Sequence, residues 1–98
     1  MKVRLLFDRR VVVSATAFAE LILWALPRPS RGSAHRYKYR LAFVVNDGCM
    51  LRYDNEAGKG DHVHRNGRER SYVFVDTDRL VADFFSDVRR WLDENRDA

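Results

Sequence analysis

Cysteine is almost absent from this chain: Cys49 is the only one in 98 residues, so no intramolecular disulfide can form. A fold without disulfides fits a reducing compartment, and we expect the protein in the cytoplasm. The most apolar stretch, AFAELILWAL at residues 17–26, contains Glu20 and is too short to cross a bilayer as a helix. These absences argue against a disulfide scaffold and a helical membrane protein, and we expect no signal peptide.

Proline and glycine are also scarce, with two and five residues respectively. Both prolines fall in PRPSRGS, residues 27–33, which predicts one long loop and leaves most of the chain for regular structure. A hydrophobic share of 46% is enough for one modest core. We therefore expect a single domain over residues 1–98.

Positive charge is concentrated in the middle of the chain. Residues 28–70 carry ten bases and five acids, a net charge of +5, together with all three histidines. Residues 71–98 carry four bases and seven acids, a net charge of −3. A basic middle predicts an anionic partner, with nucleic acid as the first candidate, although a mixed solvated surface has a similar composition.

The first quarter of the chain predicts mainly β-structure. Residues 2–13 hold two apolar runs around Asp8-Arg9-Arg10, which predicts strand, turn, strand. Residues 14–27 are open between a helix, which their alanines and leucines favour, and a strand. As a strand this segment has two distinct faces: Phe18, Glu20, Ile22 and Trp24 on one, and Ala19, Leu21 and Leu23 on the other.

The second half predicts a hairpin and a terminal helix. HRYKYRLAFVV, residues 35–45, alternates as a strand does, and Asn-Asp-Gly turns it into CMLRYDN with Cys49, Leu51 and Tyr53 on one face. SYVFV, residues 71–75, predicts another strand, and an amphipathic helix runs from Asp76 or Thr77 to about Asn95.

These elements predict an α+β fold, a small antiparallel sheet of about five strands in meander-like order packed against one C-terminal helix. If the helix covers one face only, Leu21, Leu23 and Trp24 could form an interface with a second copy or another protein. The sequence leaves a homodimer open.

The segment YDNEAGKGDHVHRNGRERSY, residues 53–72, is the best candidate for a site. Gly58 and Gly60 permit a tight turn around Lys59, although the spacing of a P-loop is missing. His62 and His64 share one side of a strand if the segment is extended. Such a pair suits acid–base cleavage of RNA, or a metal site completed by Asp61 or His35, and a plain polar loop has the same composition.

Neighbouring segments could support this site. HRYKYR at residues 35–40 places bases along a stripe that suits a phosphate backbone. Asp54 could orient a histidine, and Tyr53 could stack on a base or donate to a leaving oxygen. The candidate residues are His62, His64, Lys59, Asp54 and Tyr53 for catalysis, and Lys38, Arg40, Arg36, His35 and Arg52 for binding nucleic acid.

The motifs LP.P..GSAHRYKYRLAFVV, LRYDNEAGKGDHVH and G.E..Y.F.....L..DF..DV together resemble the TumE family of toxin–antitoxin proteins over nearly the whole chain. The resemblance implies a β-rich half before one terminal helix, and therefore a strand at residues 17–25. It also implies a type II toxin, neutralised by an antitoxin that often carries a helix-turn-helix DNA-binding domain. The chain departs from the family at Val63, where we expect a basic residue between the histidines.

The leading hypothesis is a toxin that cleaves RNA without a metal ion or other cofactor, with His62 or His64 as base or acid. One alternative is a non-catalytic module that binds nucleic acid or the antitoxin. A second alternative is a metal-dependent nuclease that uses His35, Asp61, His62 and His64.

Overall fold

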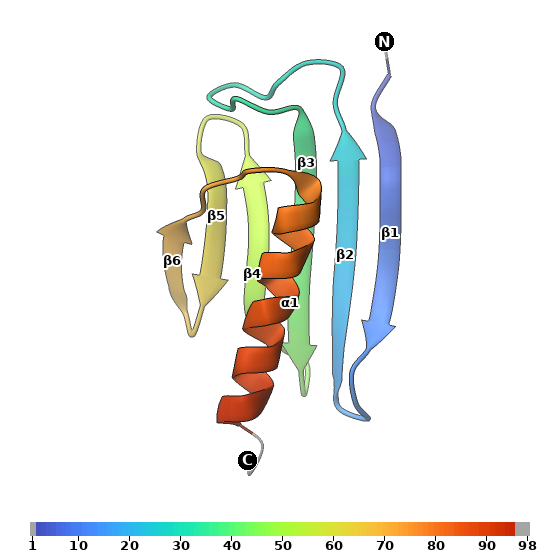
Figure 1. Ribbon diagram of the computed structural model, residues 1–98, viewed down its shortest axis with the longest axis vertical. Coiled ribbons are helices and arrows are strands. Elements are labelled where there is room, and N and C mark those ends of the chain that lie inside the picture. Colours follow the sequence, from blue (N-terminus) through green and yellow to red (C-terminus); the bar gives the residue numbers. More distant parts are fainter. Residues whose placement is uncertain (1, 96–98) are drawn as a thin grey trace.

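A computed structural model describes residues 2–95, which form a six-stranded antiparallel sheet and one helix (Figure 1). The elements are β1 Arg4–Val12, β2 Ala17–Ala25, β3 Tyr37–Val45, β4 Gly48–Glu56, β5 Gly60–Arg65, β6 Arg68–Ser71 and α1 Thr77–Glu94. Each strand pairs with its neighbour in sequence, which is the order of a meander. The predicted α+β class is confirmed, with six strands in place of about five.

Helix α1 lies against one face of the sheet, over its middle strands (Figure 1). Its bounds, Thr77 to Glu94, confirm the prediction. The helix begins after Asp76 because the Asp76 carboxylate accepts a hydrogen bond from the Arg79 N–H at 2.7 Å and caps the first turn. Leu80, Phe84 and Val88 form the buried stripe of the helix. They pack against the buried strand residues Leu21, Leu23, Tyr39, Leu41, Phe43, Leu51, Tyr53 and Val63. No helix among residues 2–95 is long and apolar enough to span a membrane.

Residues 17–25 are a strand, as the resemblance implied, and the two predicted faces of that strand are confirmed. Leu21 and Leu23 are 5% and 1% exposed in the core beneath α1, so neither can form the interface suggested for them. Trp24 points to the other face, which no helix or strand of residues 2–95 covers. We call this other face the open face of the sheet.

Strand β1 runs through Asp8, Arg9 and Arg10 without the predicted turn, and these residues pair with β2. The strand is an edge of the sheet and is largely exposed on both faces. Its charged side chains therefore reach water from within the strand, and on an edge they also discourage pairing with other chains. Charge in the middle of an apolar run did not mark a turn here.

The strand predicted at residues 71–75 is wrong except for Ser71. Residues 72–75 form an extended connection from β6 to α1. Tyr72 and Phe74 pack on the core, while Val73 and Val75 are 81% and 63% exposed. This alternation produced a strand-like pattern, although the ladder with β5 ends at Ser71 and one further bond, from the Tyr72 N–H to the Asp61 carbonyl oxygen at 3.0 Å.

Cys49 does not share a face with Leu51, contrary to the prediction. Phe43 pairs with Leu51 but Val44 pairs with Cys49, which leaves Met50 as the extra residue of a β-bulge. Met50 packs on the core and Cys49 is exposed, because one inserted residue reverses the alternation of faces.

Candidate functional site

The motif from Tyr53 to Tyr72 forms the end of β4 and the hairpin of β5 and β6, rather than a loop. Successive side chains of a strand point to opposite faces, and the register divides the motif accordingly. One group faces α1: Tyr53, Asn55, Asp61 and Val63. The other group faces the open side: Arg52, Asp54, His62 and His64. Val63, where the resemblance suggested a base, is 3% exposed and therefore lies away from the two histidines.

Six ionisable residues meet on the open face, and we call them the histidine cluster: Arg52, Asp54, Lys59, His62, His64 and Glu69. They come from β4, β5, β6 and the turn between β4 and β5. The cluster contains four of the five predicted catalytic residues and one predicted nucleic-acid ligand, and it adds Glu69.

Glu69 joins the two histidines. Its Oε1 lies 2.8 Å from Lys59 Nζ and 3.2 Å from His62 Nδ1, and its Oε2 lies 3.8 Å from His64 Nδ1. The hydrogen bond from Lys59 lowers the pKa of Glu69, and the same bond raises the pKa of Lys59. Both groups are charged at neutral pH, so a carboxylate orients the two imidazoles.

Sequence reasoning missed Glu69, although the chain contains a signal for it. Asn66 and Gly67 have φ angles of 52° and 75°, the left-handed conformation that an Asn-Gly hairpin turn requires. A hairpin at this dipeptide pairs His64 with Glu69, as the structure shows.

The two imidazoles have different hydrogen-bond partners. His62 Nε2 donates to the Lys59 carbonyl oxygen at 2.9 Å while its Nδ1 faces Glu69, so both nitrogens face acceptors, which suits an imidazolium. His64 Nε2 instead accepts from Arg52 Nη2 at 3.1 Å, which places the lone pair on that nitrogen. The geometry suits His62 to giving a proton and His64 to taking one.

Arg52 and Asp54 border the cluster on β4. Arg52 Nε lies 3.1 Å from Asp54 Oδ2, yet this buried nitrogen has no aligned hydrogen-bond partner in residues 2–95. The pair is thus held by charge rather than by a directed bond. The Arg52 side chain is 35% exposed, which leaves its guanidinium room to turn toward a ligand.

The predicted basic stripe is only partly present. Arg40 is exposed on the open face, and Lys38 on the same face donates to the Asn55 carbonyl oxygen. Arg36 precedes β3 and lines a separate cavity of about 560 Å³ with Lys2 and Arg4. Lys38 and Arg40 therefore extend the open face, whereas Arg36 belongs to another surface.

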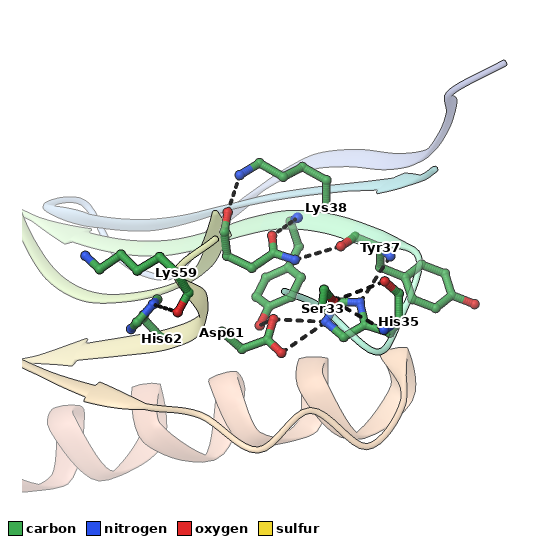
Figure 2. A network of polar contacts seen from close by, with 9 residues as sticks. Ser33, His35, Tyr37, Lys38, Lys59, Asp61 and His62 are labelled. Carbon is green, nitrogen blue, oxygen red and sulfur yellow. Dashed lines mark hydrogen bonds and ion pairs between the residues drawn. The ribbon is translucent and has the colours of Figure 1, made fainter. Parts of the chain in front are cut away.

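His35 and Asp61 contact each other beneath the sheet, on the side of α1 (Figure 2). His35 Nε2 donates to both Asp61 carboxylate oxygens, at 2.9 and 3.0 Å, and His35 Nδ1 accepts from the Tyr37 N–H at 3.1 Å. The Tyr39 hydroxyl also donates to Asp61, and the Phe74 ring stacks on His35 with 3.9 Å between ring centroids. This network holds the start of β3 against the connection to α1. His35 therefore does not lie on the open face with Lys38 and Arg40, with which the sequence grouped it as a nucleic-acid-binding residue.

Asn55 has a structural part as well. Its Nδ2 donates to the Tyr37 carbonyl oxygen at 2.7 Å, and its Oδ1 accepts from the Tyr39 N–H at 3.1 Å. The pairing between β3 and β4 ends at Arg40 and Asp54. The Asn55 amide therefore replaces backbone bonds where the ladder stops.

Tyr53 points into the core and is 1% exposed. Its hydroxyl donates to the Asp87 carboxylate and accepts from Arg65 Nη2 at 3.0 Å. Burial, and then Asp87, raises the pKa of Tyr53, so the phenol stays protonated at neutral pH. Tyr53 therefore lies on the face of the sheet opposite His62 and His64, with which the sequence grouped it.

The turn that carries Lys59 is held by the long loop. The Gly58 N–H donates to the Arg31 carbonyl oxygen at 2.6 Å, and Gly58 adopts a φ of 80°, which favours glycine. The next carbonyl, that of Lys59, accepts from His62. The loop at residues 27–33 thus contributes indirectly to the position of His62.

Gly58→Ala is expected to lower the free energy of unfolding by about 1–2 kcal/mol, because alanine is strained in the left-handed region. The added Cβ also meets Arg31 Nη2 at 2.8 Å, so the guanidinium must move. Gly67→Ala is the matched control, since Gly67 has a φ of 75° and open space around the added Cβ. Urea unfolding should show losses for both variants. Only Gly58→Ala should shift the His62 ring resonances in NMR spectra, and an equal shift from Gly67→Ala contradicts the link through Lys59.

The four residues suggested as metal ligands do not come together. His62 and His64 lie on the open face, and His35 and Asp61 lie on the face of α1. Within residues 2–95, no three or more histidine, cysteine, aspartate or glutamate side chains are arranged to hold a metal ion.

The chain was compared with family models, curated proteins and solved structures. A family model described as Toxin TumE matches residues 2–92, a range that includes all six strands and the whole histidine cluster. No curated protein and no solved structure matches the chain significantly.

Proposed function

The chain belongs to the TumE toxin family, and on this premise we propose that it is a type II toxin that cleaves RNA on the open face of its sheet without a metal ion. The supporting observation is the histidine cluster, in which Glu69 joins two imidazoles between Lys59 and Arg52. Such a group can supply an acid, a base and positive charge to one phosphodiester.

In the proposed reaction the ribose 2′-hydroxyl attacks the adjacent phosphorus. Arg52 turns from His64 to a non-bridging phosphate oxygen, which frees the lone pair of His64 Nε2 to take the hydroxyl proton. The His62 Nε2–H leaves the Lys59 carbonyl oxygen and gives its proton to the 5′-oxygen as the bond from phosphorus to that oxygen breaks, while His62 Nδ1 stays at Glu69. The products are a 2′,3′-cyclic phosphate and a 5′-hydroxyl end.

Charge around the histidines supports each step. Lys59 and Arg52 stabilise the negative charge that grows on the phosphate oxygens in the transition state. Asp54, whose Oδ1 lies 3.7 Å from His64 Nε2, favours the imidazolium that His64 becomes. Glu69 holds both rings toward the same substrate position.

The purified protein is expected to cut a mixed RNA in the presence of EDTA and to leave 2′,3′-cyclic phosphate ends, because the reaction uses only side chains. Gel analysis and end-specific labelling of the products measure both properties. The same RNA with 2′-O-methyl groups is the control and should stay intact, since it has no attacking hydroxyl. Cutting that EDTA abolishes would support a metal-dependent nuclease instead.

A non-catalytic binding module is the second candidate. The pairing of Lys59 with Glu69 and of Arg52 with Asp54 favours it, because a set of mutually paired charges is also typical of a recognition surface. This candidate requires salt-sensitive binding of RNA without cleavage, and binding that survives replacement of both histidines by glutamine.

The proposed partner is a cognate antitoxin with a helix-turn-helix DNA-binding domain, acting with the toxin in the cytoplasm. An antitoxin that covers the open face would block access to His62 and His64, whose side chains are 11% and 25% exposed. Protection of this face from solvent exchange in the complex is the corresponding observation.

A further inference from the structure

The hairpin of β5 and β6 has a second polar surface on the side opposite the histidine cluster. A cavity of about 510 Å³ there is lined by Val63, Arg65, Asn66, Arg68 and Arg70. Three of these five residues are arginines, and no carboxylate of residues 2–95 is among them. We call this surface the arginine cavity.

The arginine cavity has positive charge that the described part of the chain does not balance. Arg65 is directly opposite Arg68 in the register, and like charges in opposite positions destabilise a pair of strands. Arg65 is neutralised by Asp87, with 2.7 Å from Arg65 Nε to Asp87 Oδ2. Arg68 and Arg70 are exposed, and neither forms an ion pair within residues 2–95. The chemistry that fits two unpaired guanidinium groups on a concave surface is a phosphate group.

The position of β6 connects this cavity to the histidine cluster. β6 forms the edge of the sheet opposite β1, and Glu69 of the cluster lies between Arg68 and Arg70 in the sequence of β6. Glu69 points to the open face, and its two neighbours therefore point to the other face. Because an edge is one strand thick, a flexible polyanion that crosses it can contact both faces.

We propose that the arginine cavity binds the phosphates of the RNA segment next to the cleavage point, so that a single-stranded substrate bends over the β6 edge. This inference rests on the proposed function for the identity of the ligand. It assigns Arg68 and Arg70 as binding residues for the flanking nucleotides. Arg65 stays with Asp87 and Tyr53 and lines the cavity wall.

The test measures binding of a 2′-O-methyl RNA of twelve nucleotides to an Arg68→Ala/Arg70→Ala variant over a range of salt concentrations. Loss of two phosphate contacts is expected to lower the slope of log K against log salt by about 1.4, which corresponds to about 25-fold weaker binding at 0.1 M salt. Cleavage of unmodified RNA should show the loss mainly in KM. The matched control is Arg4→Ala/Arg9→Ala, which removes the same charge from the opposite edge strand, β1.

Each result has a clear meaning. A smaller slope in the β6 variant and an unchanged slope in the β1 variant support the proposal. Equal losses in both variants show that only net charge matters for RNA binding. No loss in the β6 variant excludes RNA binding by the arginine cavity. The same conclusion holds if that variant loses only its binding to the antitoxin. Binding of the uncleavable RNA is scored without catalysis, so a protein that fails to cut RNA refutes the proposed function and leaves this test intact.

Discussion

His64→Gln is expected to lower RNA cleavage by about 10²–10⁴-fold, because in the proposed reaction His64 takes the 2′-hydroxyl proton, whereas the nearby carboxylates of Asp54 and Glu69 are paired with Arg52 and Lys59. His62→Gln should give a comparable loss, since the 5′-oxygen then leaves without a proton. The double variant should be little worse than the weaker single variant, because an acid and a base that share one transition state act as a unit. Single-turnover cleavage at saturating RNA measures these rates.

The third histidine provides the matched control for both substitutions. His35→Gln removes the hydrogen bonds to Asp61 and the stacking on Phe74, so it should lower the melting temperature. His35 lies on the other side of the sheet, and the folded variant should therefore cut RNA at the rate of the unchanged protein. Cleavage that persists in His62→Gln and His64→Gln, or that falls as far in His35→Gln, rules out acid–base catalysis by the cluster.

Local patterns in the sequence were sufficient for most of the fold. The alternation in β3 predicted two distinct faces, because a strand has a period of two, and the alternation in β2 did so once the resemblance had favoured a strand over a helix. The apolar stripe through Leu80, Phe84 and Val88 predicted the helix and put its start at Asp76 or Thr77, because such a stripe depends only on neighbours within one or two turns. These are short-range features that one segment specifies alone.

The predictions were wrong where the structural role of a residue depends on the position of its strand in the sheet. The charges of Asp8 to Arg10 were interpreted as a turn because the edge position of β1 is invisible in one segment. The bulge at Met50 reversed the face of Cys49, and a bulge depends on the register of two strands. Both errors are failures of non-local information.

The candidate site shows the same limit at the level of single residues. The metal alternative grouped Asp61 with His62 and His64, yet Asp61 and its neighbour Asn55 face α1 and hold β3, while His62 faces the open side. Residue type alone does not separate a buried structural amide or carboxylate from a catalytic one. The register of β4 and β5 does separate them, and it follows once both segments are assigned as strands.

Asp87 was overlooked although its spacing indicates burial. It lies three residues after Phe84 and four before Trp91, which places it on the apolar stripe of α1. A carboxylate in such a position requires partners, and it has them: the Tyr53 hydroxyl and the guanidinium of Arg65 both donate to Asp87 Oδ2. The Asp87 side chain is 7% exposed and that of Arg65 is 39% exposed, so a buried carboxylate is paired with a guanidinium that partly reaches water.

Asp87→Ala is expected to lower the free energy of unfolding by about 2–4 kcal/mol, because it removes the shared acceptor of the buried Tyr53 hydroxyl and of Arg65, which is 39% exposed. The melting temperature should fall by more than about 10 °C in a chain of this size. Urea unfolding followed by circular dichroism gives the free energy, and an unchanged m-value shows that the unfolded state is the same. Asp87→Asn keeps an acceptor, so its free energy of unfolding should lie between those of the unchanged protein and of Asp87→Ala.

The matched control for Asp87 is Asp83→Ala, one turn earlier on the same helix. Asp83 is 31% exposed, pairs with Arg79, which is 63% exposed, and accepts from the half-buried Tyr72 hydroxyl at 2.7 Å, so its loss should cost about 1–2 kcal/mol. Similar losses from the two variants would mean that the buried network is not a main source of stability. Because Asp87 and the histidine cluster lie on opposite faces, the Asp87→Ala protein that remains folded should still bind the uncleavable RNA through the open face. Lower stability with unchanged RNA binding would mean that Tyr53 and Asp87 stabilise the fold and that the histidine cluster acts independently of them.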